Sequence, residues 1–209
     1  ALSNLSKSGD TTYTAQFTVT DGGTDVASGA DIPVSLVLAD PNGNASATFT
    51  TAISQASDAI DANAPTVASV AVADGTYQIG NTVTVTITAA NNEAGLTLSS
   101  KTFNGQTLTN VTDQNNGTYT ATYTVVEGDA KVADGGSVTT DLGFTDAAGN
   151  VGAKTTSVTL GGESIDATKP TISAVSITDA AMNIDDVVTA TITVGNATGE
   201  TLSLSSGSI

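Results

Sequence analysis

Two copies of one short motif divide this sequence into repeats. Residues 58–66 read Asp-Ala-Ile-Asp-Ala-Asn-Ala-Pro-Thr, and 105 residues later residues 163–171 read Glu-Ser-Ile-Asp-Ala-Thr-Lys-Pro-Thr. In both copies two acidic residues, three positions apart, precede Pro-Thr and a strand-like run. Because proline fixes its own φ and favours extended backbone in the residue before it, each motif predicts a stiff connector between domains.

The period of the repeat sets the size of the folding unit. A period near 105 residues in a chain of 209 residues predicts two domain equivalents, each of the usual size for a β-sandwich. The 38 threonines, together with many valines, glycines, asparagines and aspartates, favour strands and turns over helices. No apolar run is long enough to span a membrane and no signal peptide is present, so we expect an internal part of a larger protein.

The middle copy, residues 66–162, alternates apolar residues with threonines as half-buried strands do. The expected strands are residues 67–72, 83–87, 96–103, 108–111, 119–125, 138–144 and 156–160, with residues 74–81 expected to form a loop. Seven short strands separated by regular turn signals are typical of an immunoglobulin-like sandwich. The predicted fold is therefore all-β, with tandem immunoglobulin-like β-sandwiches of seven strands each in a linear array.

The flanking segments repeat only parts of the middle copy. The strand at Tyr13–Val19 matches Tyr119–Val125 at an offset of 106 residues, whereas the strands at 172–177, 187–194 and 202–206 match those at the start of the middle copy. The predicted organisation is a C-terminal half sandwich (1–57), a linker (58–65), a complete sandwich (66–162), a second linker (163–170) and an N-terminal half sandwich (171–209).

A half sandwich buries too little apolar surface to be stable alone, and its open edges favour pairing with further strands. We expect neighbouring repeats of the same protein to supply the missing strands. The arrangement that we favour is a continuous tandem protein. The alternative is head-to-tail completion by another chain, which is heterologous and would propagate into a filament.

The composition excludes several classes of function. A net charge of −16 argues against nucleic acid and against anionic membranes as partners. Histidine and cysteine are absent, so the sequence has no residue that would activate a serine or threonine nucleophile. A carboxylate pair could cleave glycosides, but the low aromatic content offers no platform for a sugar. We therefore expect no enzyme, no catalytic residues and no small-molecule substrate.

Acidic residues gather in the loops that the sandwich topology brings to its two ends. One end should collect Asp58, Asp61, Glu93, Asp146 and Asn150, and the opposite end should collect Asp74, Glu127, Asp129, Glu163 and Asp166. The upstream half should place Asp21, Asp25 and Asp31 beside Asp58. Calcium binds six to eight oxygen ligands from carboxylates and carbonyls, which such loops supply. The sequence thus predicts Ca²⁺ at the interdomain junctions, although many Asp-Gly turns are also explained by turn chemistry alone.

Several motifs together resemble one family. Residues 117–125 (Gly-Thr-Tyr-Thr-Ala-Thr-Tyr-Thr-Val), 127–129 (Glu-Gly-Asp), 146–150 (Asp-Ala-Ala-Gly-Asn) and 165–171 (Ile-Asp-Ala-Thr-Lys-Pro-Thr) resemble the tandem bacterial immunoglobulin-like extender domains of giant repeats-in-toxin (RTX) adhesins. Relatives of that kind include the repeat regions of ice-binding and biofilm adhesins. The first copy departs from the pattern, with Asp-Gly-Gly at 21–23 in place of Glu-Gly-Asp at 127–129.

The resemblance implies an extracellular spacer on a bacterial cell surface, rigidified by calcium at its domain junctions. By that resemblance the calcium ligands would come from the linker acids and from Glu127, Asp129 and Asp146. The alternative from another class is a module that itself binds a carbohydrate or a host protein. Few aromatic residues are available for such recognition, which favours the spacer.

Overall fold

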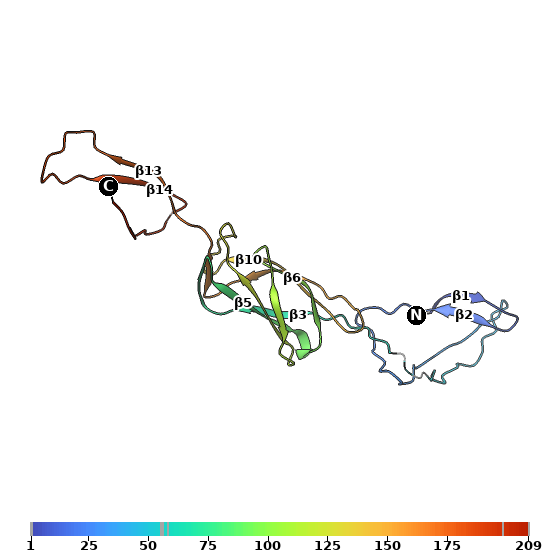
Figure 1. Ribbon diagram of the computed structural model, residues 1–209. Helices are drawn as coiled ribbons and strands as arrows, with labels where there is room; N and C mark the ends of the chain where they lie inside the picture. The colour runs from blue at the N-terminus through green and yellow to red at the C-terminus, as the bar shows by residue number, and fades with distance from the viewer. Residues whose placement is uncertain (1, 55–56, 58, 198, 209) are drawn as a thin grey trace.

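The chain forms three parts arranged in a row in the computed structural model (Figure 1), which describes residues 2–54, 57, 59–197 and 199–208. A central β-sandwich lies between a small N-terminal part, which contains β1 and β2, and a C-terminal hairpin of β13 and β14. The described residues contain strands and a single short 3-10 helix, η1 (Ala90–Asn92), as the sequence predicted for an all-β protein.

Two antiparallel four-stranded sheets make up the central sandwich. The strand order is β3-β5-β9-β8 in one sheet and β11-β10-β6-β7 in the other. The bounds are β3 (Val67–Val72), β5 (Thr82–Ala89), β6 (Thr97–Phe103), β7 (Gln106–Thr107), β8 (Thr109–Asp113), β9 (Thr118–Thr124), β10 (Ser137–Thr145) and β11 (Thr155–Thr159). This arrangement is an immunoglobulin-like β-sandwich, and each strand expected in this segment is present to within a few residues.

The apolar face of each strand points between the sheets. In β5, Val83, Val85 and Ile87 are completely buried, while threonines occupy the opposite face. Two aromatic contacts anchor the core: the rings of Tyr119 and Phe144 lie 4.7 Å apart, and those of Phe103 and Tyr123 lie 5.9 Å apart. The core is confined to the central sandwich and to residues of the connectors that touch it.

One pair of strands was not expected from the sequence. The segment expected as the loop 74–81 contains β4 (Gly75–Gln78), and the predicted second linker begins with β12 (Glu163–Asp166). These strands pair in parallel, with Ile165 opposite Tyr77. Because Ile165 is buried here, the connector contributes to the core instead of only linking domains.

The N-terminal part reproduces the second half of the sandwich. It contains β1 (Ser3–Lys7) and β2 (Tyr13–Gln16), with isolated bridges joining Ile32 to Ile53 and Leu36 to Phe49. The β1–β2 pairs are Ser3–Gln16, Ser6–Thr14 and Lys7–Tyr13, which is the register of the β8–β9 pairs shifted by 106 residues. Residues 32–38 and 49–53, the counterparts of β10 and β11, form only single bridges, because they have no complete sheet to join.

The C-terminal part reproduces the first half. It contains β13 (Thr171–Ile177) and β14 (Ala190–Gly195), paired with Val175 opposite Ile192 and Ile177 opposite Ala190. Shifted by 105 residues, this is the register of β3 and β5. The expected strand at Leu202–Ser206 does not form, since the counterpart of its partner β10 is absent from this part of the structure.

Candidate functional site: the two domain junctions

The first junction joins the loop at residues 20–27 to the connector at residues 59–65. The amide of Gly22 donates to the carbonyl of Ala62 at 2.8 Å, and Val26 and Ile60 exchange two backbone hydrogen bonds of 2.8 and 2.9 Å. The connector is therefore held along its length by the loop of the preceding half sandwich, as an extra edge strand would be.

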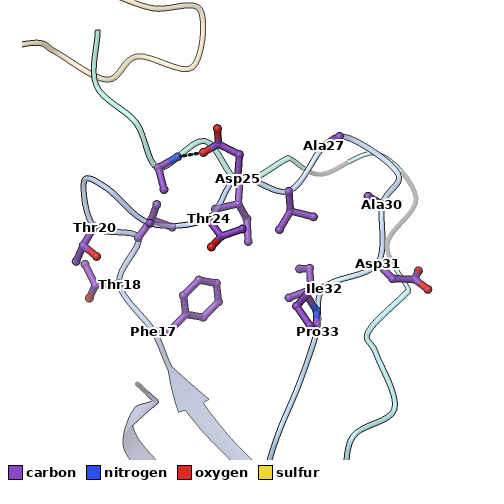
Figure 2. A pocket seen from close by; sticks show the side chains of 15 residues that line it. Phe17, Thr18, Thr20, Thr24, Asp25, Ala27, Ala30, Asp31, Ile32 and Pro33 are labelled. Carbon is purple, nitrogen blue, oxygen red and sulfur yellow. Dashed lines mark hydrogen bonds between the residues drawn. The ribbon is translucent and has the colours of Figure 1, made fainter. Parts of the chain in front are cut away.

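Two carboxylates of that loop also bind the connector. Asp21 accepts a hydrogen bond of 3.0 Å from the amide of Ala64. Asp25 accepts hydrogen bonds of 2.8 Å from the amide of Ala62 (Figure 2) and from the side-chain amide of Asn63. The sequence placed these acids beside Asp58, which lies outside the described residues; in the structure their oxygens bind N–H groups of the connector. Asp31, named with them, lines the adjoining pocket instead.

The second junction repeats the backbone contacts of the first. It joins residues 126–132 to residues 163–170. The amide of Gly128 donates to the carbonyl of Ala167 at 3.1 Å, and Val132 and Ile165 exchange hydrogen bonds of 2.9 and 2.8 Å. These pairs are the first-junction pairs shifted by 105 or 106 residues, so the two junctions have the same pattern of backbone hydrogen bonds.

The side chains of the second junction differ in charge from those of the first. Lys169 forms an ion pair of 3.1 Å with Glu127, and Lys131 forms ion pairs with Asp166 at 3.0 Å and with Glu200 at 2.6 Å. The hydrogen bonds from Lys131 and from the amide of Thr168 hold the pKa of Asp166 below its usual value, and the pKa of Lys131 is raised by Glu200 and Asp166. Lysine thus supplies at this junction the positive charge that a cation would bring.

Three acids approach one another at the end of the central sandwich that faces the first junction. Burial, followed by the negative charges of Asp146 and Asp61, raises the pKa of Glu93. Asn150 donates from its side chain to the carbonyl of Asp61 at 3.4 Å and to the carboxylate of Asp146 at 2.9 Å. We call Asp61, Glu93, Asp146 and Asn150 the acidic end; the sequence predicted that these four residues share one pole.

The turn at residues 146–150 fixes two of these side chains. Partial desolvation raises the pKa of Asp146, but hydrogen bonds from the side chain and backbone of Asn150 outweigh it and hold the pKa below its usual value. Asp40 and Asn44 form the same turn in the N-terminal part, with hydrogen bonds of 2.7 and 2.8 Å to the Asp40 carboxylate. The motif is therefore a self-contained turn, and in the central sandwich Asn150 also reaches the connector.

A glycine lets the connector approach this end closely. A Cβ atom at Gly152 would lie 1.7 Å from the carbonyl oxygen of Pro65, and Pro65 itself is buried. Ser46 occupies the equivalent position in the N-terminal part. Only a residue without a side chain permits this contact, so Gly152 sets how the first connector sits on the sandwich.

The predicted site residues at the opposite end contact nearby backbone and side-chain groups. Asp129 is buried and accepts hydrogen bonds from the amide of Val126 and the side chain of Gln106. Glu163 is also buried and accepts a hydrogen bond of 2.6 Å from the amide of Gly161. The carboxylate of Asp74 lies against Gly162. These acids stabilise local turns, which the sequence alone did not indicate.

The oxygens of the acidic end have the chemistry that calcium binds, whereas the second junction does not fit the ion because lysines occupy it. Within the described ranges, no three acidic side chains lie close enough to hold a metal ion in this arrangement. Asp58, the remaining predicted ligand, lies outside the described residues.

The sequence analysis did not identify Lys131, Lys169 and Gly152. The feature that could have identified them is that each differs in residue type from the equivalent position in the first copy.

The pocket at the first junction is an unfilled part of a core. It has a volume of about 460 Å³, and Phe17 and Ile32 are among the residues that line it (Figure 2). The equivalent positions in the central sandwich, Tyr123 and Val138, are buried. The pocket is thus the space that the other half of a sandwich would occupy.

Residues 61–161 match the family model of a bacterial Ig-like domain. The comparison with curated proteins found no match, and the comparison with solved structures found none either. In the described part of the chain no helix is long and apolar enough to cross a membrane. Bacterial Ig-like domains are typically structural, non-enzymatic modules at the cell surface. The central sandwich, with the end of the first connector, is therefore similar to one bacterial Ig-like domain.

Proposed function

We propose that the chain is an extracellular spacer of a large bacterial surface adhesin, in which Ig-like repeats hold a distal binding module away from the cell. The observation that carries this proposal is the shared backbone pairing of the two junctions. At each one, a loop of the preceding sandwich forms three backbone hydrogen bonds with the connector. A connector bound in this way resists bending, which is the property that a spacer needs.

Calcium is proposed to stiffen the first junction only. The acidic end combines three carboxylates and a carbonyl oxygen. Burial, followed by the negative charges of Asp146 and Asp61, raises the pKa of Glu93, and a bound cation would relieve that repulsion. Asp61, Glu93 and Asp146 would be ligands after moving closer together than they lie in this structure, with Asn150 holding the carbonyl of the connector. The ion would supply positive charge between the connector and the sandwich. At the second junction Lys131 and Lys169 already do so.

Thermal unfolding tests the calcium part of this proposal. A ligand that binds only the folded state adds about 2.7 kcal/mol at a hundredfold excess over its Kd. Millimolar Ca²⁺ is expected to raise the Tm of the central sandwich, and Asp61→Asn is expected to remove most of that rise. Asp10→Asn is the matched control, because it changes the same charge on an exposed residue of the N-terminal part. Equal rises in both variants, or no rise in the unsubstituted chain, would contradict calcium binding at the acidic end.

Small-angle scattering tests the spacer itself. With or without calcium, a stiff chain keeps a large maximum dimension, whereas freely bending junctions would reduce the average maximum dimension of the chain. We expect Asp25→Ala, which removes two hydrogen bonds to the first connector, to reduce that dimension. Asp141→Ala, which removes an exposed ion pair with Lys154 inside the sandwich, should not. A reduction of the same size in both variants would argue against a role of the junction contacts.

A further inference from the structure

Threonines cover the outer side of one sheet of the central sandwich. In β5 and β9 every second residue, from Thr82 to Thr88 and from Thr118 to Thr124, is a threonine that faces outward, and the residues between them are buried in the core. The threonines of the two strands stand directly opposite one another, as Thr84 and Thr122 do, so their side chains form neighbouring rows. We call these outward threonines of β5 and β9 the threonine face.

The threonine face is uncharged in a strongly acidic chain. The sequence has 21 acidic and five basic residues, yet the outward positions beside the face hold small uncharged residues, Ser69 and Ala71 in β3 and Thr112 in β8. The outward side of the other sheet differs, because Asp141 of β10 forms an exposed ion pair of 3.0 Å with Lys154. Two copies of a chain with a net charge of −16 repel each other, and the threonine face lets them meet without bringing like charges together.

Threonine side chains also lose little freedom when they pack. Branching at Cβ restricts their χ1 torsion, so burying them costs less conformational entropy than burying lysine or glutamate would. Each threonine presents a methyl group for packing and a hydroxyl group that can both donate and accept a hydrogen bond. Two identical threonine faces therefore supply matching groups to each other.

The area of the face limits the strength of one contact. Four strands, each about 4.8 Å from the next and about 23 Å long for seven residues, present roughly 450 Å². A stable complex buries about 800 Å² on each partner, so one pair of faces would associate weakly. The equivalent residues of the other repeats are also uncharged: Thr14, Gln16 and Thr18 upstream, and Thr189, Thr191 and Thr193 downstream. Weak contacts that recur along two linked chains reinforce one another.

We propose that the threonine face packs against the same face of a second copy of this chain, so that two chains lie side by side. The repeat favours a second copy as the partner, because its faces recur after the same 105 or 106 residues as those of this chain. The contact joins identical surfaces and is therefore closed by a two-fold axis. It would connect neighbouring chains laterally, and it depends neither on the spacer function nor on calcium.

Opposite charges placed on the face test this contact. Thr84 is exposed near the middle of β5, so Thr84→Glu and Thr84→Lys should leave the sandwich folded. Because a central residue of a two-fold contact lies near its own copy, either variant alone brings like charges together. Sedimentation of the unsubstituted chain over a concentration series should show association, and each variant should raise the half-association concentration at least about tenfold. An equimolar mixture of the two variants should associate again, because glutamate then faces lysine.

Thr139→Glu and Thr139→Lys are the matched controls. Thr139 is an exposed threonine on the outward side of β10, so these substitutions change the net charge equally but lie on the other sheet, and they should leave association unchanged. An unsubstituted chain that stays monomeric over the whole series overturns the proposal. Association that the Thr84 variants weaken no more than the Thr139 variants also overturns it. A loss that the mixture does not restore overturns the same face of a second copy as the partner.

Discussion

The strand Tyr119–Val125 and the segment Tyr13–Val19 have nearly the same sequence but opposite environments. In the central sandwich Tyr119, Tyr123 and Val125 are 1%, 4% and 1% exposed, whereas Tyr13, Phe17 and Val19 are 51%, 54% and 48% exposed. The alternation of apolar residues fixes which face of a strand is apolar. Whether that face is buried depends on strands that come from another part of the repeat.

Truncating one core residue at equivalent positions should give the largest difference between these regions. Phe144 is completely buried against Tyr119, and Phe144→Ala should destabilise the central sandwich by about 3–5 kcal/mol through lost contacts and a cavity. Leu38, its counterpart, is 56% exposed, so Leu38→Ala should change stability by less than about 0.5 kcal/mol. Urea unfolding at low protein concentration measures both. Comparable losses would mean that the N-terminal part already has a core of its own.

Much of the sandwich could be predicted because its strands are strongly periodic. The alternation of valine and threonine in β5 and of tyrosine and threonine in β9 predicts both the strands and their buried faces. β4 and β12 could not be predicted in this way. They pair in parallel across 88 residues, from Thr76 to Ser164, and each is only four residues long. The segment Leu202–Ser206 is the opposite case. It has the sequence pattern of a strand but forms none, because the strand that would pair with it is missing.

Gly152 and Ser46 mark a second difference between the repeats, and substitution of Gly152 should have the next largest effect. Gly152→Ala places a methyl group against the carbonyl of Pro65, which forces the connector or the strand end to move, at a cost of about 1–3 kcal/mol. Gly161→Ala is the control, because no atom lies within 4 Å of the added methyl group. Thermal unfolding should show a lower Tm for Gly152→Ala alone. Equal Tm values would mean that the connector is not held against the sandwich.

The two buried tyrosines of β9 should respond differently to loss of the hydroxyl group. Tyr119 accepts a hydrogen bond of 2.8 Å from the amide of Leu96 and donates one of 3.2 Å to the carbonyl of Glu93. The hydroxyl of Tyr123 makes no hydrogen bond of good geometry to a described residue although Asn104 is near, and burial raises the pKa of Tyr123 to about 12. The N-terminal part keeps a tyrosine, Tyr13, at the first position but has Phe17 at the second.

Tyr119→Phe should therefore lower stability by about 1–2 kcal/mol, because the Leu96 amide loses its partner in a buried place. Tyr123→Phe should be neutral or slightly stabilising, since it removes a buried hydroxyl that lacks a good partner. Urea unfolding of the two variants gives the comparison. A larger loss from Tyr123→Phe would show that its hydroxyl has a partner in solution.

The candidate site was only partly predictable for a related reason. The loop order of a sandwich brings Asp61, Glu93 and Asp146 to one end, and the electrostatic effect on Glu93 agrees with that placement. The sequence could not show that carboxylates at the other end satisfy backbone amides, as Glu163 does for Gly161. Such contacts depend on short-range geometry, whereas the placement of loops depends only on the direction of the strands.

Neutralising one glutamate at each end should give the smallest effect and the most specific one. The folded state raises the pKa of Glu93, so between its ordinary pKa and the raised value the folded chain binds more protons than the unfolded chain. Stability from this group is therefore present at low pH and is lost as the pH rises through the folded pKa. Glu93→Gln removes the repulsion with Asp146 and Asp61. At pH 7 without calcium it should therefore raise the Tm slightly, which corresponds to a gain of less than about 0.5 kcal/mol in the free energy of unfolding. That gain should disappear near pH 4, where the glutamate is protonated in both states.

Glu127→Gln is the matched change at the other end, where Glu127 faces Lys169, and it should bring no gain at either pH. In millimolar calcium the sign for Glu93→Gln should reverse, because the substitution then removes a proposed ligand. Melting curves of both variants at the two pH values, with calcium and with chelator, measure these differences. If Glu93→Gln still raised the Tm at pH 4, repulsion between Glu93 and the neighbouring carboxylates would not be the cause of the gain in stability.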